Sequence, residues 1–116
     1  MAYRSDTYLL CTPNIGKALK IVTANAEKDY QPQITEFSSA FYFQWCYVPW
    51  SPEYEPFCKD IYEVLTKFDS VPEEGYKLIR FGDKTDDITE EFNEHGYDLF
   101  NEDFFPLRTI RLPADL

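Results

Sequence analysis

The chain has 116 residues and a formal net charge of −10, with 21 Asp and Glu against 11 Lys and Arg. This length supplies apolar material for one hydrophobic core and not for two, so we predict that residues 1–116 form a single compact domain. The excess of negative charge disfavours direct binding to nucleic acids and to anionic lipids, which are themselves negatively charged. The aromatic content of 18% separates the chain from disordered sequences, which contain few aromatic residues.

The cysteines and the apolar runs indicate the compartment. Cys11, Cys46 and Cys58 are an odd set at irregular spacing, which is typical neither of a disulfide framework nor of paired zinc ligands. The N-terminus is not followed by the apolar segment of a secretory signal, and the longest uncharged run, 37–52, is too short and too polar to span a membrane. We therefore expect a cytoplasmic protein with reduced thiols, no membrane segment, no metal and no other cofactor.

The N-terminal part of the chain predicts a strand followed by a helix. Residues 7–11 are apolar and β-prone, which favours a buried strand. Thr12 and Pro13 are typical of a helix N-cap and of the first helical position. A helix over about 13–28 is then predicted by apolar residues at helical spacing, namely Ile15, Ala18, Leu19, Val22 and Ala26. A β-hairpin turning at 14–16 remains an alternative, because β-branched residues follow that turn.

The middle of the chain predicts a second strand and a second helix. Residues 41–48 are aromatic or apolar on both faces of a period-two pattern, which is typical of a central strand, and Pro49 ends it. The next helix is predicted over about 52–69, since its apolar residues recur at helical spacing: Phe57, Ile61, Val64, Leu65 and Phe68. Because Pro56 lies within the first two turns, the regular helix can begin as late as this residue.

The remaining segments predict shorter strands. Residues 76–81 form the clearest one, 88–93 form a short one with Ile88 and Phe92 facing inward, and 105–112 form the last. Together these elements predict an α+β fold. We expect a mostly antiparallel sheet of three to five strands, with the two helices (about 13–28 and 52–69) packed on one face.

Negative charge is concentrated in one segment, which suggests a binding surface. Residues 83–103 contain nine acidic residues and one basic residue, for a net charge of −8. Charges so close together repel one another, so a basic partner would relieve a folding cost. We take the partner-binding candidates from this segment and from aromatic residues of the types enriched at interfaces: Asp83, Asp86, Asp87, Glu90, Glu91, Glu94, Asp98, Tyr97 and Trp50. The alternative is a solvated acidic loop that only keeps the protein soluble.

No catalytic or metal-binding residues are predicted. Acidic residues occupy positions 1, 5, 9 and 12 of an EF-hand count starting at Asp83, but Ile88 fills position 6, where the calcium loop needs glycine. His95 is the only histidine, and it lies in a polar run without a nucleophile elbow.

The sequence therefore favours a non-enzymatic, acidic protein-binding domain. In composition the chain resembles the small acidic inhibitors carried by phages and mobile elements, whose carboxylates imitate DNA phosphates. This resemblance implies an inhibitor that occupies the basic, nucleic-acid-binding site of a partner protein. Two alternatives come from other classes: a small cofactor-free enzyme that uses a carboxylate, and a homo-oligomeric accessory protein that pairs through its aromatic strand. The oligomeric state itself is not predicted.

Overall fold

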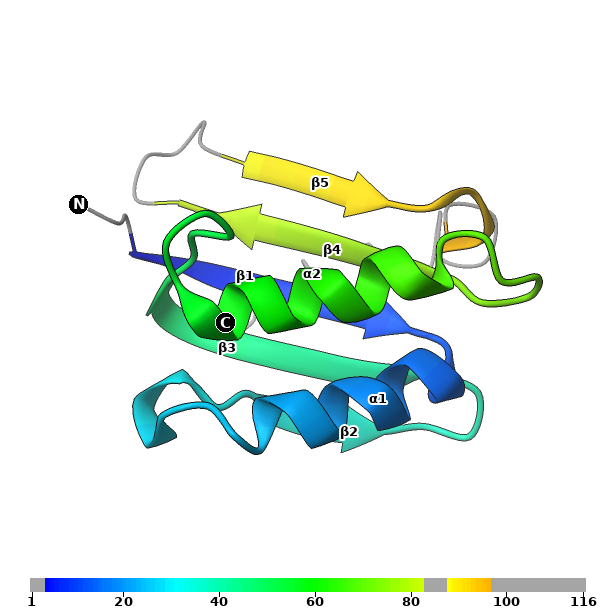
Figure 1. Ribbon diagram of the computed structural model, residues 1–116, viewed down its shortest axis with the longest axis horizontal. Coiled ribbons are helices and arrows are strands. Elements are labelled where there is room, and N and C mark those ends of the chain that lie inside the picture. The colour runs from blue at the N-terminus through cyan, green and yellow to red at the C-terminus, as the bar shows by residue number, and fades with distance from the viewer. Residues whose placement is uncertain (1–3, 83–87, 97–116) are drawn as a thin grey trace, which may run out of the picture.

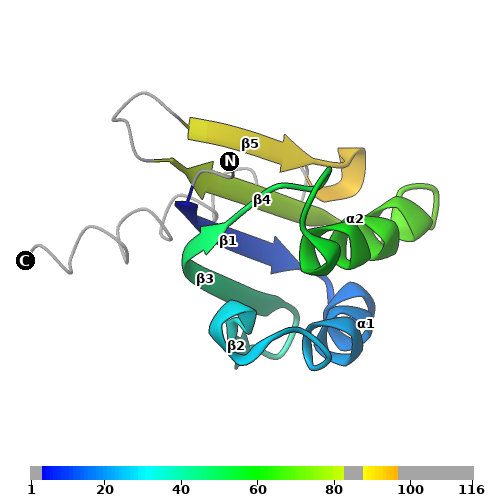
Figure 2. The same cartoon turned by 60° about the vertical axis from the view of Figure 1, so that its left-hand side comes forward.

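The computed structural model describes residues 4–82 and 88–96, which form one antiparallel sheet and three helices. The sheet order is β2-β3-β1-β4-β5 (Figure 1). Both α-helices lie on the same face of this sheet in two views (Figures 1 and 2), so the predicted α+β fold is confirmed. The elements follow one another as β1 (Arg4–Cys11), α1 (Pro13–Thr23), the 3-10 helix η1 (Lys28–Tyr30), β2 (Gln33–Glu36), β3 (Phe41–Pro49), α2 (Pro56–Phe68), β4 (Tyr76–Phe81) and β5 (Ile88–Phe92).

Strand β1 is the centre of the sheet and pairs with β3 on one side and with β4 on the other. Its pairing with β3 shifts register between Ser5 and Thr7, which marks a β-bulge. At this bulge Tyr47 has a positive φ of 51°, and its backbone N–H donates to the Asp6 carboxylate at 2.8 Å. The side-chain hydrogen bond thus stabilises a backbone conformation that a residue with a bulky side chain rarely adopts.

Strand β3 is an interior strand, because β2 and β1 pair with its two edges. Residues Phe41–Gln44 therefore have no free edge to which a second copy of the chain could add. A homo-oligomer would therefore have to form through a surface other than the backbone edge of this segment.

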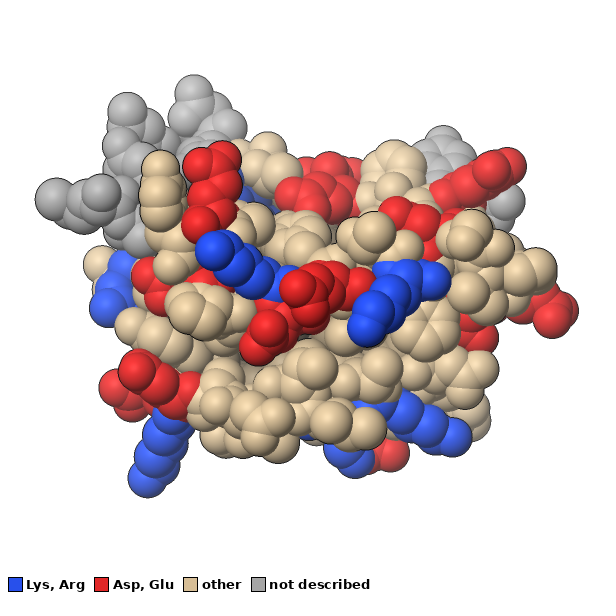
Figure 3. Space-filling model, in the orientation of Figure 1, with Lys and Arg blue, Asp and Glu red and all other residues tan. Residues whose placement is uncertain are grey.

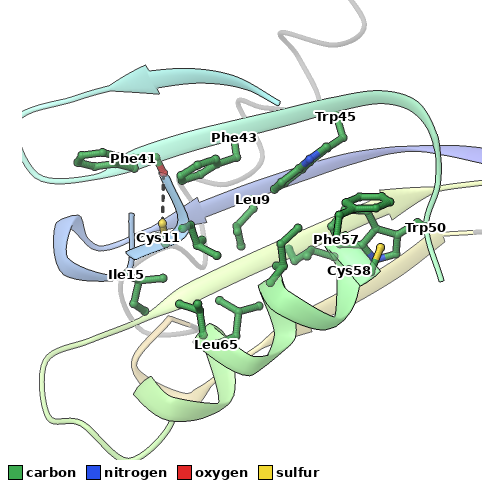
Figure 4. Close-up of a cluster of buried hydrophobic side chains, with 14 of the residues drawn as sticks. Leu9, Cys11, Ile15, Phe41, Phe43, Trp45, Trp50, Phe57, Cys58 and Leu65 are labelled. Carbon is green, nitrogen blue, oxygen red and sulfur yellow. Dashed lines mark hydrogen bonds between the residues drawn. The ribbon is translucent and has the colours of Figure 1, made fainter. Parts of the chain in front are cut away.

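The main core lies between the sheet and the two α-helices. Phe41, Phe43 and Trp45 project from β3 toward the helices, and each ring is within 6.4 Å of the next (Figure 4). The row continues through Trp50 to Phe57 of α2, at centroid distances of 5.1 and 5.9 Å. Burial of these large apolar surfaces is the main driving force that holds the helix layer on the sheet.

Helix α1 forms where it is predicted, and the hairpin alternative is wrong, but the helix ends at Thr23 and does not reach residue 28. The Thr23 hydroxyl donates to the carbonyl of Leu19 at 2.7 Å. The backbone N–H groups of Asn25 and Ala26 then donate to the carbonyls three residues back, so the α-helical pattern gives way to a tighter turn. Ala26 packs against the core from the turn that follows α1. Its helical spacing therefore indicated burial correctly but did not indicate that the helix extends to it.

Helix α2 begins at Pro56, the later of the two starts that the sequence allows. Residues 51–55 form a turn instead of a first helical turn, because the Ser51 carbonyl accepts from the N–H groups of Tyr54 and Glu55. The helix buries one apolar stripe that includes Phe57, Ile61 and Leu65, as its periodicity predicts.

The two edge strands differ most from the sequence prediction. Ile88 and Phe92 of β5 are 47% and 43% exposed, so their predicted inward orientation is wrong. They pair with Phe81 and Lys77 on the face opposite the helices, at the outer edge of the sheet. Strand β2 was not predicted, since Gln33–Glu36 contains a single apolar residue. The predicted strand 105–112 lies outside the described residues.

A buried carboxylate from another segment stabilises the start of α1. Thr12 is the N-cap residue but makes no capping bond of its own. Its hydroxyl donates to Glu74 at 2.5 Å, and the Asn14 amide donates to the other oxygen of Glu74 at 2.8 Å. Glu74 is 8% exposed, and its negative charge lies at the positive end of the helix dipole.

We expect Glu74→Gln to destabilise the fold by about 1–3 kcal/mol, because an amide can accept through only one oxygen and loses the charge assistance of both bonds. Urea unfolding would measure the change. Glu73→Gln is the matched control, since Glu73 is exposed and should stay within about 0.5 kcal/mol of the original chain. Equal effects of the two substitutions would contradict the capping role.

We expect Gly16→Ala to destabilise the protein, although this change in a helix interior normally stabilises by about 1 kcal/mol. A Cβ at Gly16 would overlap the Cβ and ring of Phe41. Overpacking of this kind costs about 1–3 kcal/mol, which outweighs the gain in helix propensity. Thermal or urea unfolding would test the sign, with Lys17→Ala at the next, exposed position as control. A stabilised Gly16→Ala variant would show that α1 does not pack closely on β3.

Candidate functional site: acidic recesses at the two ends of helix α2

The structure describes four of the nine predicted site residues. Glu90, Glu91, Glu94 and Trp50 lie within the described ranges. The other five lie outside them: Asp83, Asp86, Asp87, Tyr97 and Asp98.

The three described carboxylates of this set lie in different places. Glu90 pairs with Ile79 on the face opposite the helices, and one of its oxygens is 3.9 Å from the amino group of Lys77. Glu91 is the next residue of the strand and faces the helix side, because side chains alternate along β5. Glu94 follows the strand and lines a hollow at one end of the molecule. Strand alternation thus separates residues that are neighbours in the sequence.

Trp50 is a core residue and not a surface anchor. It is 8% exposed, and its indole N–H donates to the Tyr62 hydroxyl at 3.2 Å. Its ring packs edge-on against Trp45, Phe57 and Tyr62. The polar group of the indole is satisfied inside the protein and little of the ring reaches the surface, so the partner-binding role of Trp50 stays a prediction that this packing does not support.

A recess of about 200 Å³ lies at the N-terminal end of α2, and we call it the aromatic recess. Its floor is the stacked ring pair of Tyr30 and Phe57, with centroids 4.9 Å apart and an interplanar angle of 26°. Three carboxylates also line it, from Glu27, Glu55 and Asp60. The remaining lining residues are Asn25, Ala26 and Pro56.

Two segments far apart in the sequence build this recess. The turn after α1 and helix η1 supply residues 25–30, and the Gln31 amide braces this turn by donating to the carbonyls of Ala24 and Ala26 at 3.4 and 3.1 Å. The start of α2 supplies residues 55–60, and Phe57 is held there by the ring of Trp50. The recess is therefore continuous with the aromatic row of the core.

The electrostatics of the aromatic recess favour a cation. Among residues 4–82 and 88–96, no Lys or Arg nitrogen lies within 4.0 Å of the carboxylates of Glu27, Glu55 or Asp60. The faces of aromatic rings attract cations, and carboxylates accept charge-assisted hydrogen bonds from guanidinium and ammonium groups. This combination suits the apolar stem and charged head of an Arg or Lys side chain.

A second acidic recess, which we call the terminal hollow, lies at the C-terminal end of α2. It has a volume of about 230 Å³, and four acidic residues line it: Asp69, Glu73, Glu74 and Glu94. The carboxylate of Glu74 accepts from Thr12 and Asn14 at the start of α1. The negative end of the α2 dipole, at Asp69, adds to this potential. In Figure 3, Asp and Glu side chains gather at this end of the molecule, whereas Lys and Arg are interspersed with them over the middle of α2.

Hydrogen bonds from Asn93 hold the terminal hollow together. Its side-chain oxygen accepts from the backbone N–H groups of Tyr76 and Gly96 at 3.2 and 2.8 Å, and its amide donates to the carbonyl of Glu74 at 3.0 Å. One side chain thus joins the end of β5 to the loop that follows α2. Glu73 in this loop has a positive φ of 68°, a conformation that is uncommon outside glycine.

The described residues offer no metal centre. No three His, Cys, Asp or Glu side chains among them converge closely enough to hold a metal ion. The same part of the chain contains no helix that is long and apolar enough to cross a membrane. Comparisons with protein-family models, curated proteins and solved structures found no match.

The Tyr76 hydroxyl, which lies beside the terminal hollow, should make the stability of the fold depend on pH in the alkaline range. It donates to the Asp69 carboxylate at 3.3 Å. Burial, together with the charges of Asp69 and Glu91, raises the pKa of Tyr76 from 10.0 to about 12. The unfolded chain therefore loses this proton first, so the stabilising contribution is complete below pH 10, declines above it, and is lost as the pH passes about 12.

We expect Tyr76→Phe to make this decline shallower, because phenylalanine has no proton to lose. The free energy of unfolding, measured in urea between pH 9 and about pH 12, should fall less steeply for the variant than for the original chain. Parallel curves would show that Tyr76 ionises equally easily in the folded and unfolded states.

Proposed function

We propose that this protein is a non-enzymatic acidic domain that binds a basic protein and receives an Arg or Lys side chain of that partner in the aromatic recess. One observation carries the proposal: the stacked rings of Tyr30 and Phe57 share a recess with Glu27, Glu55 and Asp60, and no Lys or Arg nitrogen of the described residues lies within 4.0 Å of these three carboxylates. Cation–π contact contributes about 0.5–2 kcal/mol, and each exposed charge pair adds about 0.2–1 kcal/mol.

The terminal hollow extends the proposed surface. Helix α2 has 13 residues, so the two recesses at its ends are separated by roughly 20 Å at 1.5 Å per residue. A partner with basic groups at this separation would engage both recesses at once. The second contact would then be intramolecular, which raises the overall affinity without any new type of interaction.

A finer form of the proposal concerns the class of partner. Nucleic-acid-binding proteins carry dense Lys and Arg surfaces, and a chain with a net charge of −10 would occupy such a surface in place of phosphates. In this form the protein is an inhibitor of its partner. The support is the overall charge and the acidic run of residues 83–103, most of which lies outside the described residues. The enzymatic alternative would use one carboxylate of the aromatic recess as acid or base.

A titration with penta-arginine, followed by NMR, tests the proposed site. The ring signals of Tyr30 and Phe57 should shift, and the affinity should fall with salt, because screening weakens contacts between exposed charges. Signals that shift uniformly over the surface, or an affinity that does not depend on salt, would contradict a recess that binds through its carboxylates.

Two matched double variants separate the recess from the overall charge. Glu55→Gln with Asp60→Asn removes two carboxylates of the recess, whereas Glu53→Gln with Glu63→Gln removes two exposed carboxylates nearby. Each pair changes the net charge from −10 to −10 + 2 = −8. At about 0.5 kcal/mol for each contact, we expect the recess pair to lose about fivefold in affinity for penta-arginine. The control pair should lose less than about twofold, and equal losses would mean that only the total charge matters.

A further inference from the structure

Three buried polar groups interrupt the main core, and we call them the polar cluster. They are the hydroxyls of Ser5 and Thr7 in β1 and the indole N–H of Trp45 in β3. These residues are only 2%, 0% and 1% exposed, and no atom of the described residues forms a hydrogen bond with any of the three groups. Almost all buried polar groups in folded proteins are hydrogen-bonded, so each group needs a partner that the described part of the chain does not supply.

The polar cluster lies on the side of the sheet that the helices cover. Thr7 is directly opposite Trp45 in the pairing of β1 with β3, and directly opposite residues project from the same face. The indole ring of Trp45 stacks on Phe43 and packs edge-on against Trp50, and Trp50 contacts Phe57 of α2 (Figure 4). The core between β3 and α2 therefore encloses the indole.

The bulge in β3 keeps the third group on the same face. Side chains alternate along β1, so Ser5 and Thr7 project from one face together with Leu9. On β3 the bulge shifts the register, and the core residue Val48 lies opposite Ser5. The buried side chains on this face of β1 become smaller from Leu9 through Thr7 to Ser5. The space beside the indole is therefore bordered by small, polar side chains.

We propose that the polar cluster binds an internal water molecule that bridges Trp45 and Thr7. The two groups form no direct hydrogen bond. Directly opposite Cβ atoms are about 5 Å apart, and one water joins polar atoms up to roughly 5.6 Å apart, twice a bond of about 2.8 Å. The indole N–H can only donate, whereas a water accepts from it and exchanges further hydrogen bonds with the two hydroxyls. A buried water usually makes about three hydrogen bonds, which is the number that this cluster offers.

A neutral ligand suits the polar cluster better than an ion. Its three groups carry no formal charge, and burial of an ion without a charged partner is costly. Arg80 of β4 is opposite Thr7 on the other side of β1, but its guanidinium donates to Thr89 of β5, the strand farther from β1. Water is therefore the ligand that the chemistry of the cluster selects.

The bound water fixes the orientation of the Trp45 indole within the aromatic row. Trp45 packs against Trp50, and Trp50 packs against Phe57, so the water lies at the base of the packing that forms the floor of the aromatic recess. The inference is independent of the proposed function, because it concerns only polar groups inside the core.

A crystal structure of the full chain, at a resolution that shows ordered waters, tests the site directly. We expect one water within about 3.2 Å of both the Trp45 indole nitrogen and the Thr7 hydroxyl oxygen. The Trp50 indole is the internal control, because its N–H donates to the Tyr62 hydroxyl and needs no water. A direct hydrogen bond from the Trp45 indole to a protein atom, or an indole nitrogen with no water beside it, would overturn the proposal.

Thr7→Val tests the site in solution, because valine has the shape of threonine without the hydroxyl. Loss of the bridged water leaves the Trp45 N–H buried without a partner. We therefore expect a lower urea midpoint and an upfield shift of the Trp45 indole proton in NMR spectra, whereas the indole proton of Trp50 keeps its position. Thr35→Val on β2 is the matched control, since Thr35 is exposed and valine suits a strand, so the midpoint should not fall.

The sign of the change in midpoint separates the two accounts of the polar cluster. Without a water, Thr7→Val removes a buried hydroxyl that has no partner, which stabilises the fold and raises the midpoint. Either a raised midpoint or an unshifted Trp45 indole proton would overturn the proposal.

Discussion

The aromatic row between β3 and α2 is the interaction on which the rest of the structure depends. It runs from Phe41 through Trp45 and Trp50 to Phe57, and Tyr30 stacks on its last ring. The packing that fixes α2 on the sheet therefore also forms the floor of the aromatic recess. A floor held by the core needs no ordering when a ligand arrives, and such preorganisation reduces the cost of binding.

Elements with a strong pattern and large apolar side chains were predictable from the sequence. The helix α2 follows from its periodicity, because its buried face is the face that the pattern selects. The strands β1 and β4 follow from short runs of apolar and β-prone residues, which are largely buried. The errors arise where local polar contacts decide the outcome. Helix α1 ends in a turn whose backbone bonds run three residues back, and β2 is held by its pairing with β3 and not by its own composition.

The candidate site was far less predictable than the fold. Counting charges selects the densest acidic run, but alternation along β5 places Glu90 and Glu91 on opposite faces. The aromatic recess instead joins residues 25–30 to residues 55–60, and each segment by itself carries only ordinary surface charges. Only the tertiary contact between Tyr30 and Phe57 brings these carboxylates around one aromatic floor.

The most direct test of the account is to locate an arginine side chain on the protein by intermolecular nuclear Overhauser effects in the penta-arginine complex. The account predicts contacts from the arginine methylene protons to the rings of Tyr30 and Phe57, with upfield ring-current shifts of those protons. Contacts confined to other surfaces, with no ring-current shift, would contradict the aromatic recess as the binding site.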